Sequence, residues 1–297
     1  MIGCDTGFGN RLAFKLNRNG YRVYATVLSA DSKGAQQLVT SATFVEKMHV
    51  LEMDVTNDTQ VLNAYRHVQK DLESCGDKLW ALVNNAGLFS MGNLEWGTLD
   101  TFNKVFSVNV FGMVRVARAF LPLIKQSRGR VVNMVSLGGR FTFDLGGVYC
   151  MSKHTNIAFS DALRREMHKF GVTVCTIEPG LFVTPMTTNE YISQLLQQTW
   201  NQSSDEVKKS YGNSYLESQR KVALNFQNHF KAGVNIDLVV DDMVDAIQNA
   251  EPQIIYRPIE GLQSKLSCLM PVYIPSLWLD HLTYANDKSR PEGALKY

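Results

Sequence analysis

Short apolar runs alternate with amphipathic segments over the first 180 residues of the chain. The apolar runs are rich in β-branched side chains and predict buried strands at 22–26, 48–53, 79–83, 130–135 and 172–177. Between them, apolar positions recur with a helical period, which predicts helices at 10–19, 58–74, 98–126 with a break, and 148–170. This alternation predicts a parallel sheet that is covered by helices on both faces.

The fold class that follows is α/β, a doubly wound parallel sheet in a single domain over residues 1–297. We find no internal repeat and no low-complexity linker that would divide the chain. The first strand of this plan is missing, because only Met1 and Ile2 precede the glycine-rich loop that begins at Gly3. A central parallel strand buries both faces, so we expect its loss to remove much of the roughly 5–15 kcal/mol by which a domain is stable.

The character of the sequence changes after residue 180. Residues 184–233 are long, polar and rich in Gln, Asn and aromatic side chains, and they predict helices inserted before a last helix at 237–249 and a last strand at 253–256. Such an insertion often forms a lid, so we expect 184–233 to cover a substrate site. The tail at 259–297 contains an apolar stretch that Pro271 and Pro275 interrupt, which argues against a simple membrane-spanning helix.

Composition and charge exclude some functions. The chain has a formal net charge of +2 and no basic stripe, so we expect no nucleic-acid partner. Its five cysteines form no C-x-x-C pair and have no histidine cluster beside them, which indicates free thiols and no metal site. The apolar tail is left with two interpretations: a core or homodimer surface, or a patch that touches a membrane.

The loop at residues 3–9 has the glycine spacing G-x-x-x-G-x-G, and a predicted helix follows it at once. Glycines allow the backbone to approach a pyrophosphate, and the amino end of a helix favours its negative charge. The pattern is typical of a Rossmann-like sheet that binds a dinucleotide. The candidate cofactor-binding residues here are Gly3, Asp5, Thr6, Gly7, Phe8 and Gly9.

Further candidates stand at the carboxyl ends of the predicted strands, where ligands bind in an open parallel sheet. A carboxylate at the end of the 48–53 strand is placed to bond an adenine amino group, and small residues after the 79–83 strand permit close approach to a cofactor. These cofactor-binding candidates are Asp54, Val55, Asn85, Ala86 and Gly87.

Tyr149 and Lys153 are four residues apart on a predicted helix and so share one of its faces. A phenol has a pKa near 10 and is a poor base at neutral pH, but a nearby ammonium and a positive nicotinamide ring favour the phenolate. We therefore predict Tyr149 as the proton-transfer residue, with Lys153 also bonding the cofactor's ribose. Ser136, at the end of the 130–135 strand, is expected to hold the substrate oxygen. Asn109 is expected to support a water that relays the proton outward.

Together these residues resemble the short-chain dehydrogenase/reductase family, whose T-G-x-x-x-G-x-G, N-N-A-G, Ser and Y-x-x-x-K motifs match residues 2–9, 84–87, 136 and 149–153. Ile2 stands where the motif has threonine. The resemblance covers nearly the whole chain from Gly3. It implies an NAD(P)-dependent oxidoreductase that acts on CH–OH groups.

A closer resemblance is to the membrane-associated branch of retinol dehydrogenases and 17β-hydroxysteroid dehydrogenase type 6-like enzymes. Residues 138–140, 149–153, 159–166 and 178–180, with Thr184, read like that branch. The resemblance implies a lipophilic alcohol or ketone substrate of the retinol or hydroxysteroid type, NAD as cofactor, and attachment to the endoplasmic reticulum membrane. It also implies cofactor contacts from Pro179, Gly180 and Thr184. Members of the branch commonly carry a hydrophobic N-terminal segment that anchors them in the membrane. If this protein lacks such a segment, we expect it to be cytosolic.

The choice of cofactor rests on few residues. The usual discriminating positions fall on Val27 and Leu28, which carry no charge. Asp31 is placed to bond a ribose 2′-hydroxyl, and Lys33 to attract a 2′-phosphate instead. NAD is our prediction, with NADP as the alternative.

Two other functions stay open at this point. A catalytically silent binding protein is favoured by the missing strand and by Ile2 in the threonine position. An NADPH-dependent carbonyl reductase of the same family is the second alternative.

Overall fold

The structure is a computed structural model, and it describes the whole chain except residues 230, 276, 282–290 and 295–297. Its strands are all parallel and form two sheets, one of two strands in the order β1-β2 and one of four in the order β3-β4-β5-β6. Their bounds lie close to the predicted ones: β1 (Val23–Val27), β2 (Met48–Glu52), β3 (Ala81–Asn84), β4 (Arg130–Met134), β5 (Thr173–Ile177) and β6 (Ile255–Tyr256). The predicted α/β class with a doubly wound parallel sheet is confirmed.

Residues 1–4 lie in the gap between β1 and β3 and join the two sheets. Ile2 forms a parallel bridge with Asn84, and its N–H donates to the Val83 carbonyl oxygen at 2.9 Å. On the other side, the Cys4 N–H donates to the Thr26 carbonyl oxygen at 2.8 Å. A cavity of about 400 Å³ continues the gap beyond Met1, between β1 and β3. The segment thus occupies the position that the plan gives to a central strand.

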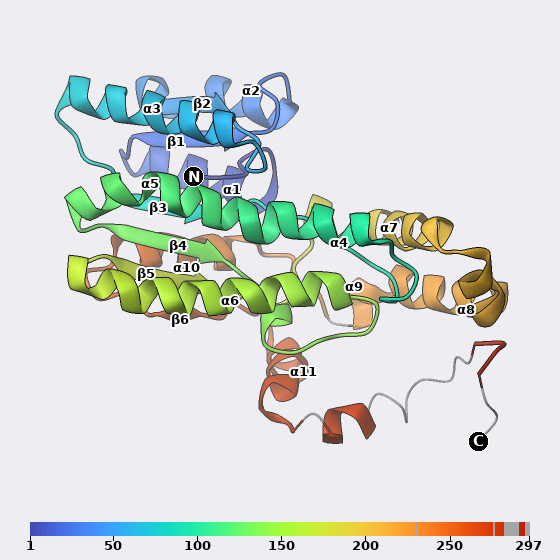
Figure 1. The fold of residues 1–297 in the computed structure, drawn as a ribbon. Coiled ribbons are helices and arrows are strands. Elements are labelled where there is room, and N and C mark those ends of the chain that lie inside the picture. The colour runs from blue at the N-terminus through green and yellow to red at the C-terminus, as the bar shows by residue number, and fades with distance from the viewer. Residues whose placement is uncertain (230, 276, 282–290, 295–297) are drawn as a thin grey trace.

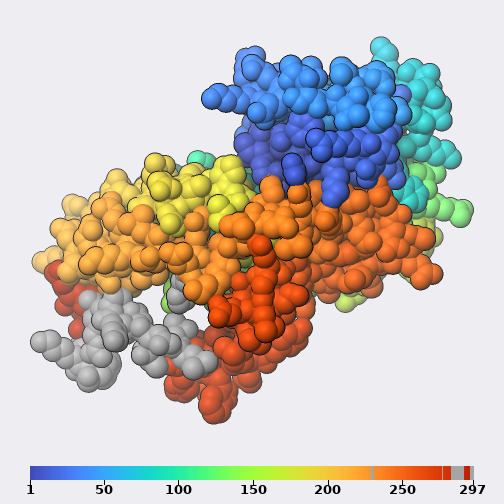
Figure 2. Space-filling view, turned by 180° about the vertical axis from the view of Figure 1, so that it is seen from behind, coloured from blue at the N-terminus to red at the C-terminus, as the bar shows by residue number. Residues whose placement is uncertain are grey.

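Three helices cover one face of the sheets: α1 (Gly7–Arg18), α2 (Lys33–Thr40) and α10 (Asp237–Gln248). Leu12 of α1 and Met243 of α10 are fully buried in the core between these helices and the strands. Figure 2 shows the N-terminal part, in blue, resting against the orange of α10. The pattern did not predict α2, because only Gly34, Ala35 and Leu38 of this short helix are buried.

The opposite face is covered by α3 (Asp58–Cys75), α5 (Met113–Ser127) and α6 (Gly147–Met167), as Figure 1 shows. The predicted break at 98–126 is a π-helical stretch, Ser107–Gly112, that joins α4 (Leu99–Phe106) to α5. Among the described residues, the helical span Leu99–Ser127 alone is long and apolar enough to cross a membrane. Half of its most apolar window is buried in the fold, and Val116, Phe120 and Ile124 pack in the core of this face.

Helices also fill the 184–233 insertion: α7 (Asn189–Gln202), α8 (Asp205–Leu224) and α9 (Phe226–His229). They share an aromatic core with the loop after β3, in which the Trp96 ring meets Trp200 and Tyr211 edge to face at centroid distances of 4.8 and 5.5 Å. Figure 1 places α7 and α8 beyond the carboxyl ends of the strands. Short 3-10 turns connect other elements at Val45–Lys47, Leu137–Gly139, His168–Phe170 and Pro185–Thr187.

The tail at 259–297 begins with α11 (Leu262–Tyr273), which projects from the body of the protein. Pro271 lies in the last turn of this helix, which ends two residues later at Tyr273. Ser264 and Cys268 are buried on the inner side, whereas Leu262 and Leu266 are 74% and 64% exposed. The parts of the tail at 276, 282–290 and 295–297 lie outside the described residues.

Candidate active site

A cavity of about 920 Å³ opens at the carboxyl ends of β1, β3, β4 and β5. Almost all the predicted site residues line it, although they come from loops far apart in the sequence. Gly9 and Asn109 are the exceptions. The lining residues among the candidates are Gly3, Asp5, Thr6, Gly7, Phe8, Asp54, Val55, Asn85, Ala86, Gly87, Ser136, Tyr149, Lys153, Pro179, Gly180 and Thr184.

The glycine-rich loop leaves room for a bulky anion. Gly3 has φ +74°, and a Cβ there would lie 2.9 Å from the Ala86 Cα, so no side chain fits. Gly7 has φ +64° with no atom within 4 Å of a built Cβ, so its space belongs to the cavity. The side-chain amide of Asn85 holds the loop by donating to the Gly3 carbonyl oxygen at 2.8 Å. The loop opens α1 at Gly7, and its geometry fits a nucleotide pyrophosphate.

The acidic side chains at this end of the cavity differ in what they can reach. Asp5 lines the cavity, and its carboxylate accepts hydrogen bonds from the Leu28 N–H at 3.1 and 3.2 Å. Asp31 and Lys33, the sequence-based candidates for cofactor choice, are not among the lining residues. Asp54 lines the cavity, and one of its oxygens accepts from the N–H and hydroxyl of Thr56 at 2.8 Å. We predict that the second carboxylate oxygen of Asp54 bonds the ligand.

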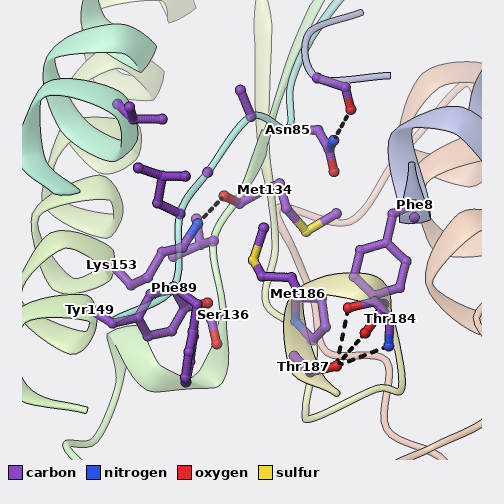
Figure 3. Close-up of a pocket in the computed structure, with 18 of the residues that line it drawn as sticks. Phe8, Asn85, Phe89, Met134, Ser136, Tyr149, Lys153, Thr184, Met186 and Thr187 are labelled. Atoms are coloured by element: carbon purple, nitrogen blue, oxygen red, sulfur yellow. Dashed lines mark hydrogen bonds between the residues drawn. The ribbon is translucent and has the colours of Figure 1, made fainter. Parts of the chain in front are cut away.

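Ser136 lies at the start of the 3-10 turn Leu137–Gly139, next to the ring of Tyr149 (Figure 3). Its hydroxyl accepts a hydrogen bond from the Gly138 N–H at 3.0 Å, so it caps the turn as well as facing the cavity. Burial raises the pKa of Tyr149 to about 12, while its hydrogen bond with Ser136 acts in the opposite direction.

Lys153 lies one helical turn after Tyr149 on α6, and its Nζ is 5.7 Å from the Tyr149 ring centroid. The ammonium is buried and donates to the Met134 carbonyl oxygen at 3.1 Å. Burial lowers the pKa of Lys153 to about 8. We predicted that this ammonium and the positive nicotinamide ring together favour the Tyr149 phenolate. From the protein groups alone the pKa of Tyr149 is raised, because desolvation of the phenolate dominates.

Asn109 is fully buried in the π-helical stretch and does not line the cavity. Its side-chain amide nitrogen donates to the Leu88 carbonyl oxygen at 3.0 Å and to the Ser152 hydroxyl at 2.9 Å, and its oxygen accepts from the Leu88 N–H at 2.7 Å. These bonds tie the loop after β3 to α6, three residues after Tyr149. The side chain therefore supports the site from behind. The predicted water relay remains a prediction.

Sequence reasoning missed the apolar wall of the cavity. The Phe89 ring lies 4.7 Å from the Tyr149 ring, centroid to centroid, and Phe143 stacks nearly parallel to Phe89 at 6.2 Å. Phe226, from the insertion, packs against both phenylalanines. The aromatic content of 184–233 was the available signal for such a wall. Other lining residues that were not predicted include Phe141, Leu181, Met186, Thr187 and Cys268.

Thr184 lines the cavity and also stabilises the loop that follows β5. Its backbone N–H donates to the Thr187 hydroxyl oxygen at 2.9 Å. The Thr187 hydroxyl in turn donates to the Phe182 carbonyl oxygen at 2.6 Å, and Figure 3 shows Thr187 beside Thr184. This reciprocal bonding fixes the Pro185–Thr187 turn at the rim of the cavity.

Known structures share this architecture. A short-chain dehydrogenase from Streptomyces avermitilis superposes with a TM-score of 0.69 at 21% identity, with 96% of this chain and 92% of that chain covered. A short-chain dehydrogenase/reductase from Burkholderia phymatum, solved in complex with NAD, gives a TM-score of 0.69 at 19% identity over 100% of this chain and 96% of that chain. At these identities the likeness establishes the fold.

Sequence comparison establishes the family. A family model of short chain dehydrogenases matches residues 1–194. Retinol dehydrogenase 16 of Rattus norvegicus is 38% identical over 99% of this chain and 90% of its own length. 17-beta-hydroxysteroid dehydrogenase type 6 of Bos taurus is 36% identical over 95% of this chain and 86% of its own. The chain therefore belongs to the short-chain dehydrogenase family, in the branch that holds the retinol dehydrogenases and 17-beta-hydroxysteroid dehydrogenase type 6.

Proposed function

We propose that the protein is an oxidoreductase that moves a hydride between NAD(H) and a lipophilic alcohol or ketone, with Tyr149 as the acid/base. The observation that carries this proposal is the position of the Tyr149 ring. Tyr149 is hydrogen-bonded to Ser136 and has the Lys153 Nζ 5.7 Å from its ring centroid, while the Phe89 and Phe143 rings lie 4.7 and 6.4 Å from it. A proton-transfer group thus meets an apolar wall inside one cavity.

The cofactor would be held by the loop residues from Gly3 to Gly9 and by the strand-end residues that line the same cavity: Asp54, Val55, Asn85, Ala86, Gly87, Pro179, Gly180 and Thr184. When bound, it supplies the hydride acceptor and donor. Buried Lys153 donates to the Met134 carbonyl oxygen, and an ammonium carries three N–H donors. Its remaining donors are available to ribose hydroxyls.

In the oxidative direction, Ser136 donates to the substrate oxygen and fixes its position. Tyr149, as phenolate, accepts the hydroxyl proton while the hydride leaves the carbinol carbon. Lys153 stabilises the phenolate through its positive charge. In the reductive direction Tyr149 returns the proton to the carbonyl oxygen. Asn109 keeps the loop after β3 and the start of α6 in register, so that these groups meet at one point.

The wall of the cavity selects the substrate class. Three phenylalanines, Leu181 and Met186 surround the space in front of Tyr149, and they offer contact area but few hydrogen bonds to a substrate. This suits a long or polycyclic hydrocarbon that carries one hydroxyl or keto group. The names of the similar proteins, retinol dehydrogenase 16 and 17-beta-hydroxysteroid dehydrogenase type 6, refer to substrates of this kind.

NAD is the cofactor that the charge distribution favours over NADP. The Asp5 carboxylate lines the cavity beside Leu28, at the end of β1. A 2′-phosphate placed there would meet a like charge, whereas a 2′-hydroxyl could donate to the carboxylate. Lys33, which would attract the phosphate, is not among the lining residues.

We also propose that the chain is one domain, in which 184–233 is a lid and the apolar tail contacts the membrane of the endoplasmic reticulum. Phe226 of the insertion reaches the wall beside Tyr149, which supports the lid. The exposed leucines of α11 support the membrane contact. A homodimer that covers the same leucines is the competing arrangement.

The function is tested with purified protein, NAD and two substrates, all-trans-retinol and a 3α-hydroxysteroid. We expect turnover of at least one substrate, and a loss of about 100-fold or more in kcat for Tyr149→Phe, since general acid–base groups contribute on this scale. NADH binding, followed by fluorescence, should stay within about threefold of wild type in the same variant. Tyr21→Phe, on the surface beyond the cavity, is the matched control. Full activity of Tyr149→Phe, or NADH binding without turnover of any retinoid or steroid, would refute the proposal.

A further inference from the structure

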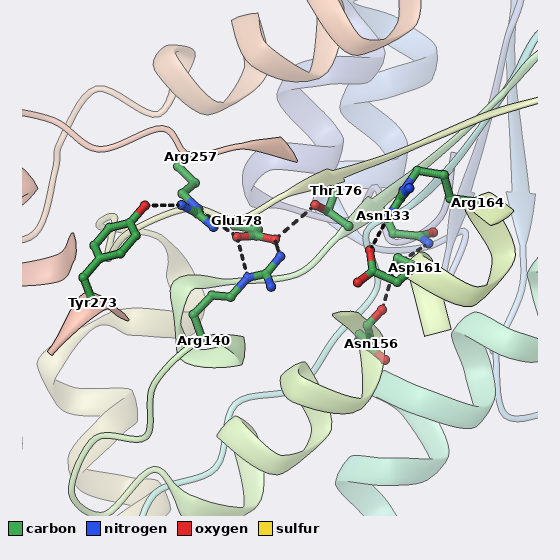
Figure 4. Close-up of polar contacts among 10 residues, drawn as sticks. Asn133, Arg140, Asn156, Asp161, Arg164, Thr176, Glu178, Arg257 and Tyr273 are labelled. Carbon is green, nitrogen blue, oxygen red and sulfur yellow. Dashed lines mark hydrogen bonds and ion pairs between the residues drawn. The ribbon is translucent and has the colours of Figure 1, made fainter. Parts of the chain in front are cut away.

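Glu178 is a fully buried carboxylate that immediately follows β5. Both of its oxygens are bonded. Arg140 donates from Nε to one oxygen at 3.0 Å and from Nη2 to the other at 2.5 Å, and Arg257 donates from Nε at 3.0 Å. The Thr176 hydroxyl adds a fourth bond at 3.1 Å. Figure 4 shows the two guanidinium groups on either side of the carboxylate.

The three charged residues come from three loops at the edge of the sheet where the candidate site lies. Arg140 ends the 3-10 turn that follows Ser136, and Glu178 precedes the Pro179 and Gly180 that line the cavity. Arg257 follows β6, and its Nη1 donates to the Tyr273 hydroxyl of α11 at 3.0 Å. One carboxylate therefore joins the loop that carries Ser136, the loop beneath the cofactor site and the start of the tail.

The backbone around Ser136 is fastened to the same place. The Val135 N–H donates to the Ile177 carbonyl oxygen at 2.8 Å, and the Leu137 N–H donates to the Pro179 carbonyl oxygen at 3.0 Å. Ser136 thus lies between two backbone hydrogen bonds to the end of β5. Glu178, which lies between the two acceptor residues Ile177 and Pro179, is bound by the Arg140 guanidinium. With both ends held, the Ser136 hydroxyl has little freedom to move relative to Tyr149.

A buried carboxylate is costly to desolvate, and a bidentate guanidinium is the partner that best offsets this cost. The hydrogen bond to Glu178 raises the pKa of Arg140, in keeping with a tight pair. Hydrophobic side chains of similar volume would give comparable stability without fixing an angle between the loops. The bidentate pair of hydrogen bonds from Arg140 to Glu178 does fix the angle between the two loops.

We propose that Arg140, Glu178 and Arg257 are positioning residues that hold Ser136 in line with Tyr149 for the reaction. The network gives a role to Arg140 and Glu178, to which the proposed function assigns none, and these are the charged residues of two sequence motifs. Gly138-Gly139-Arg140 and Glu178-Pro179-Gly180 are separate in the sequence and are the two halves of one ion pair in the fold. This inference rests on the proposed function, because it assigns the network to the placement of a catalytic serine.

The test is a double-mutant cycle between Glu178→Gln and Ser136→Ala, with kcat and both KM values measured below the melting temperature of each variant. Glu178→Gln should lower kcat by about tenfold to 100-fold, as expected for a misplaced reacting group, with the KM for NAD changed by less than about threefold. In the Ser136→Ala background the same change should cost less than about threefold, because the residue it positions is already gone. Arg140→Lys should retain more kcat than Arg140→Met.

Glu217→Gln is the matched control, because Glu217 forms an exposed pair with Arg220 on α8 and should leave kcat unchanged. Equal losses from Glu178→Gln in the wild-type and Ser136→Ala backgrounds would overturn the proposal. So would a lower melting temperature with unchanged kcat, since that result means a purely structural pair.

Hydrogen exchange of the amides of residues 137–140 gives a readout that needs no turnover. Glu178→Gln should speed their exchange by about tenfold or more relative to Glu217→Gln. If the wild-type protein turns over no substrate but Glu178→Gln speeds the exchange of these amides, the proposed function fails. The conclusion that Glu178 holds the Ser136 turn in place is then retained. If exchange does not respond in an active enzyme, the positioning proposal fails and the function stands.

Discussion

The Nζ of Lys153 lies 5.7 Å from the centroid of the Tyr149 ring and donates to the Met134 carbonyl oxygen at 3.1 Å. This carbonyl oxygen belongs to the last residue of β4, two residues before Ser136. The strand that presents the serine therefore also anchors the lysine, so a shift of β4 would move both groups together. The ammonium is nonetheless buried, and its pKa is lowered to about 8.

The buried ammonium predicts a conflict between stability and activity at Lys153. A lysine whose pKa falls from its ordinary value of 10.5 to about 8 in the fold is destabilising at pH 7, where the folded state must bury the charge. We expect Lys153→Met to raise the free energy of unfolding at pH 7 by about 1–3 kcal/mol, reduced by the free energy of the lost hydrogen bond to Met134. In the same variant kcat should fall by about 100-fold or more.

The sign of the pH dependence checks the cause. Between pH 8 and 10.5 the unfolded chain binds more protons at this lysine than the fold does, so wild-type stability should rise with pH in this window relative to Lys153→Met. Urea unfolding at pH 7 and pH 9.5 measures the difference. A gap between the two proteins that is the same at both pH values would contradict the assignment.

Asp5 is predicted to govern the choice between NAD and NADP. Asp5→Asn removes the negative charge and keeps a side chain that can contact Leu28, so NADPH binding should tighten by about tenfold while NADH binding weakens. Fluorescence titration with both cofactors gives the ratio directly. Asp31→Asn, an exposed carboxylate that does not line the cavity, is the control and should leave the ratio unchanged. If Asp5→Asn leaves the ratio of NADH to NADPH affinity unchanged, Asp5 does not govern the choice of cofactor.

Trp96 is predicted to hold the lid. It is 1% exposed and meets Trp200, Tyr211 and Tyr215 edge to face. Trp96→Ala should cost about 3–5 kcal/mol, as other large core deletions do, and should raise the KM for the lipophilic substrate more than the KM for NAD. Melting temperature and the two KM values test this. Trp278→Ala, at an exposed tryptophan, should leave both KM values as they are. Equal increases in the two KM values would argue against a lid.

The exposed face of α11 is predicted to bind lipid. Leu262→Glu with Leu266→Glu should abolish co-flotation with phosphatidylcholine vesicles, because burial of these side chains in the interface is the driving force. Leu99→Glu, at a leucine 78% exposed on α4, is the control. If the double variant still floats but changes from dimer to monomer in sedimentation velocity, the face is a subunit interface.

The cavity of about 400 Å³ beyond Met1 predicts a large response to added chain. Joining five β-branched residues ahead of Met1 should fill the space with a strand between β1 and β3. We expect a rise of several degrees or more in melting temperature relative to a Gly-Ser extension of equal length. Equal melting temperatures would show that the cavity does not accept a strand.

The local pattern was enough to predict most of the elements. Apolar runs and helical periods predicted the six strands and the main helices within a few residues, since burial of one face leaves a periodic trace in the sequence. The break at 98–126 was predicted as well, and it is the π-helical stretch that presents Asn109. Helix α2 was missed because its buried stripe is only three residues wide.

The sequence alone also predicted most of the polar and glycine residues that line the cavity. Motif spacing selected Tyr149, Lys153, Ser136 and the glycine loop, because the carboxyl ends of parallel strands meet at one edge whatever the details of packing. It did not determine their electrostatics. The pKa of Tyr149 is raised rather than lowered, because burial depends on neighbours such as Phe89 that come from another part of the chain.

Only the tertiary structure decided what joins distant segments. The pairing of Arg140 with Glu178, the approach of Phe226 to Phe89, and the place of Asp5 rather than Asp31 at the cavity all depend on contacts between loops. Local periodicity carries no record of such contacts, because each partner alone looks like an ordinary polar or aromatic residue. The sequence determines which chemistry is available, and the meeting of loops at the edge of the sheet decides which groups act on one another.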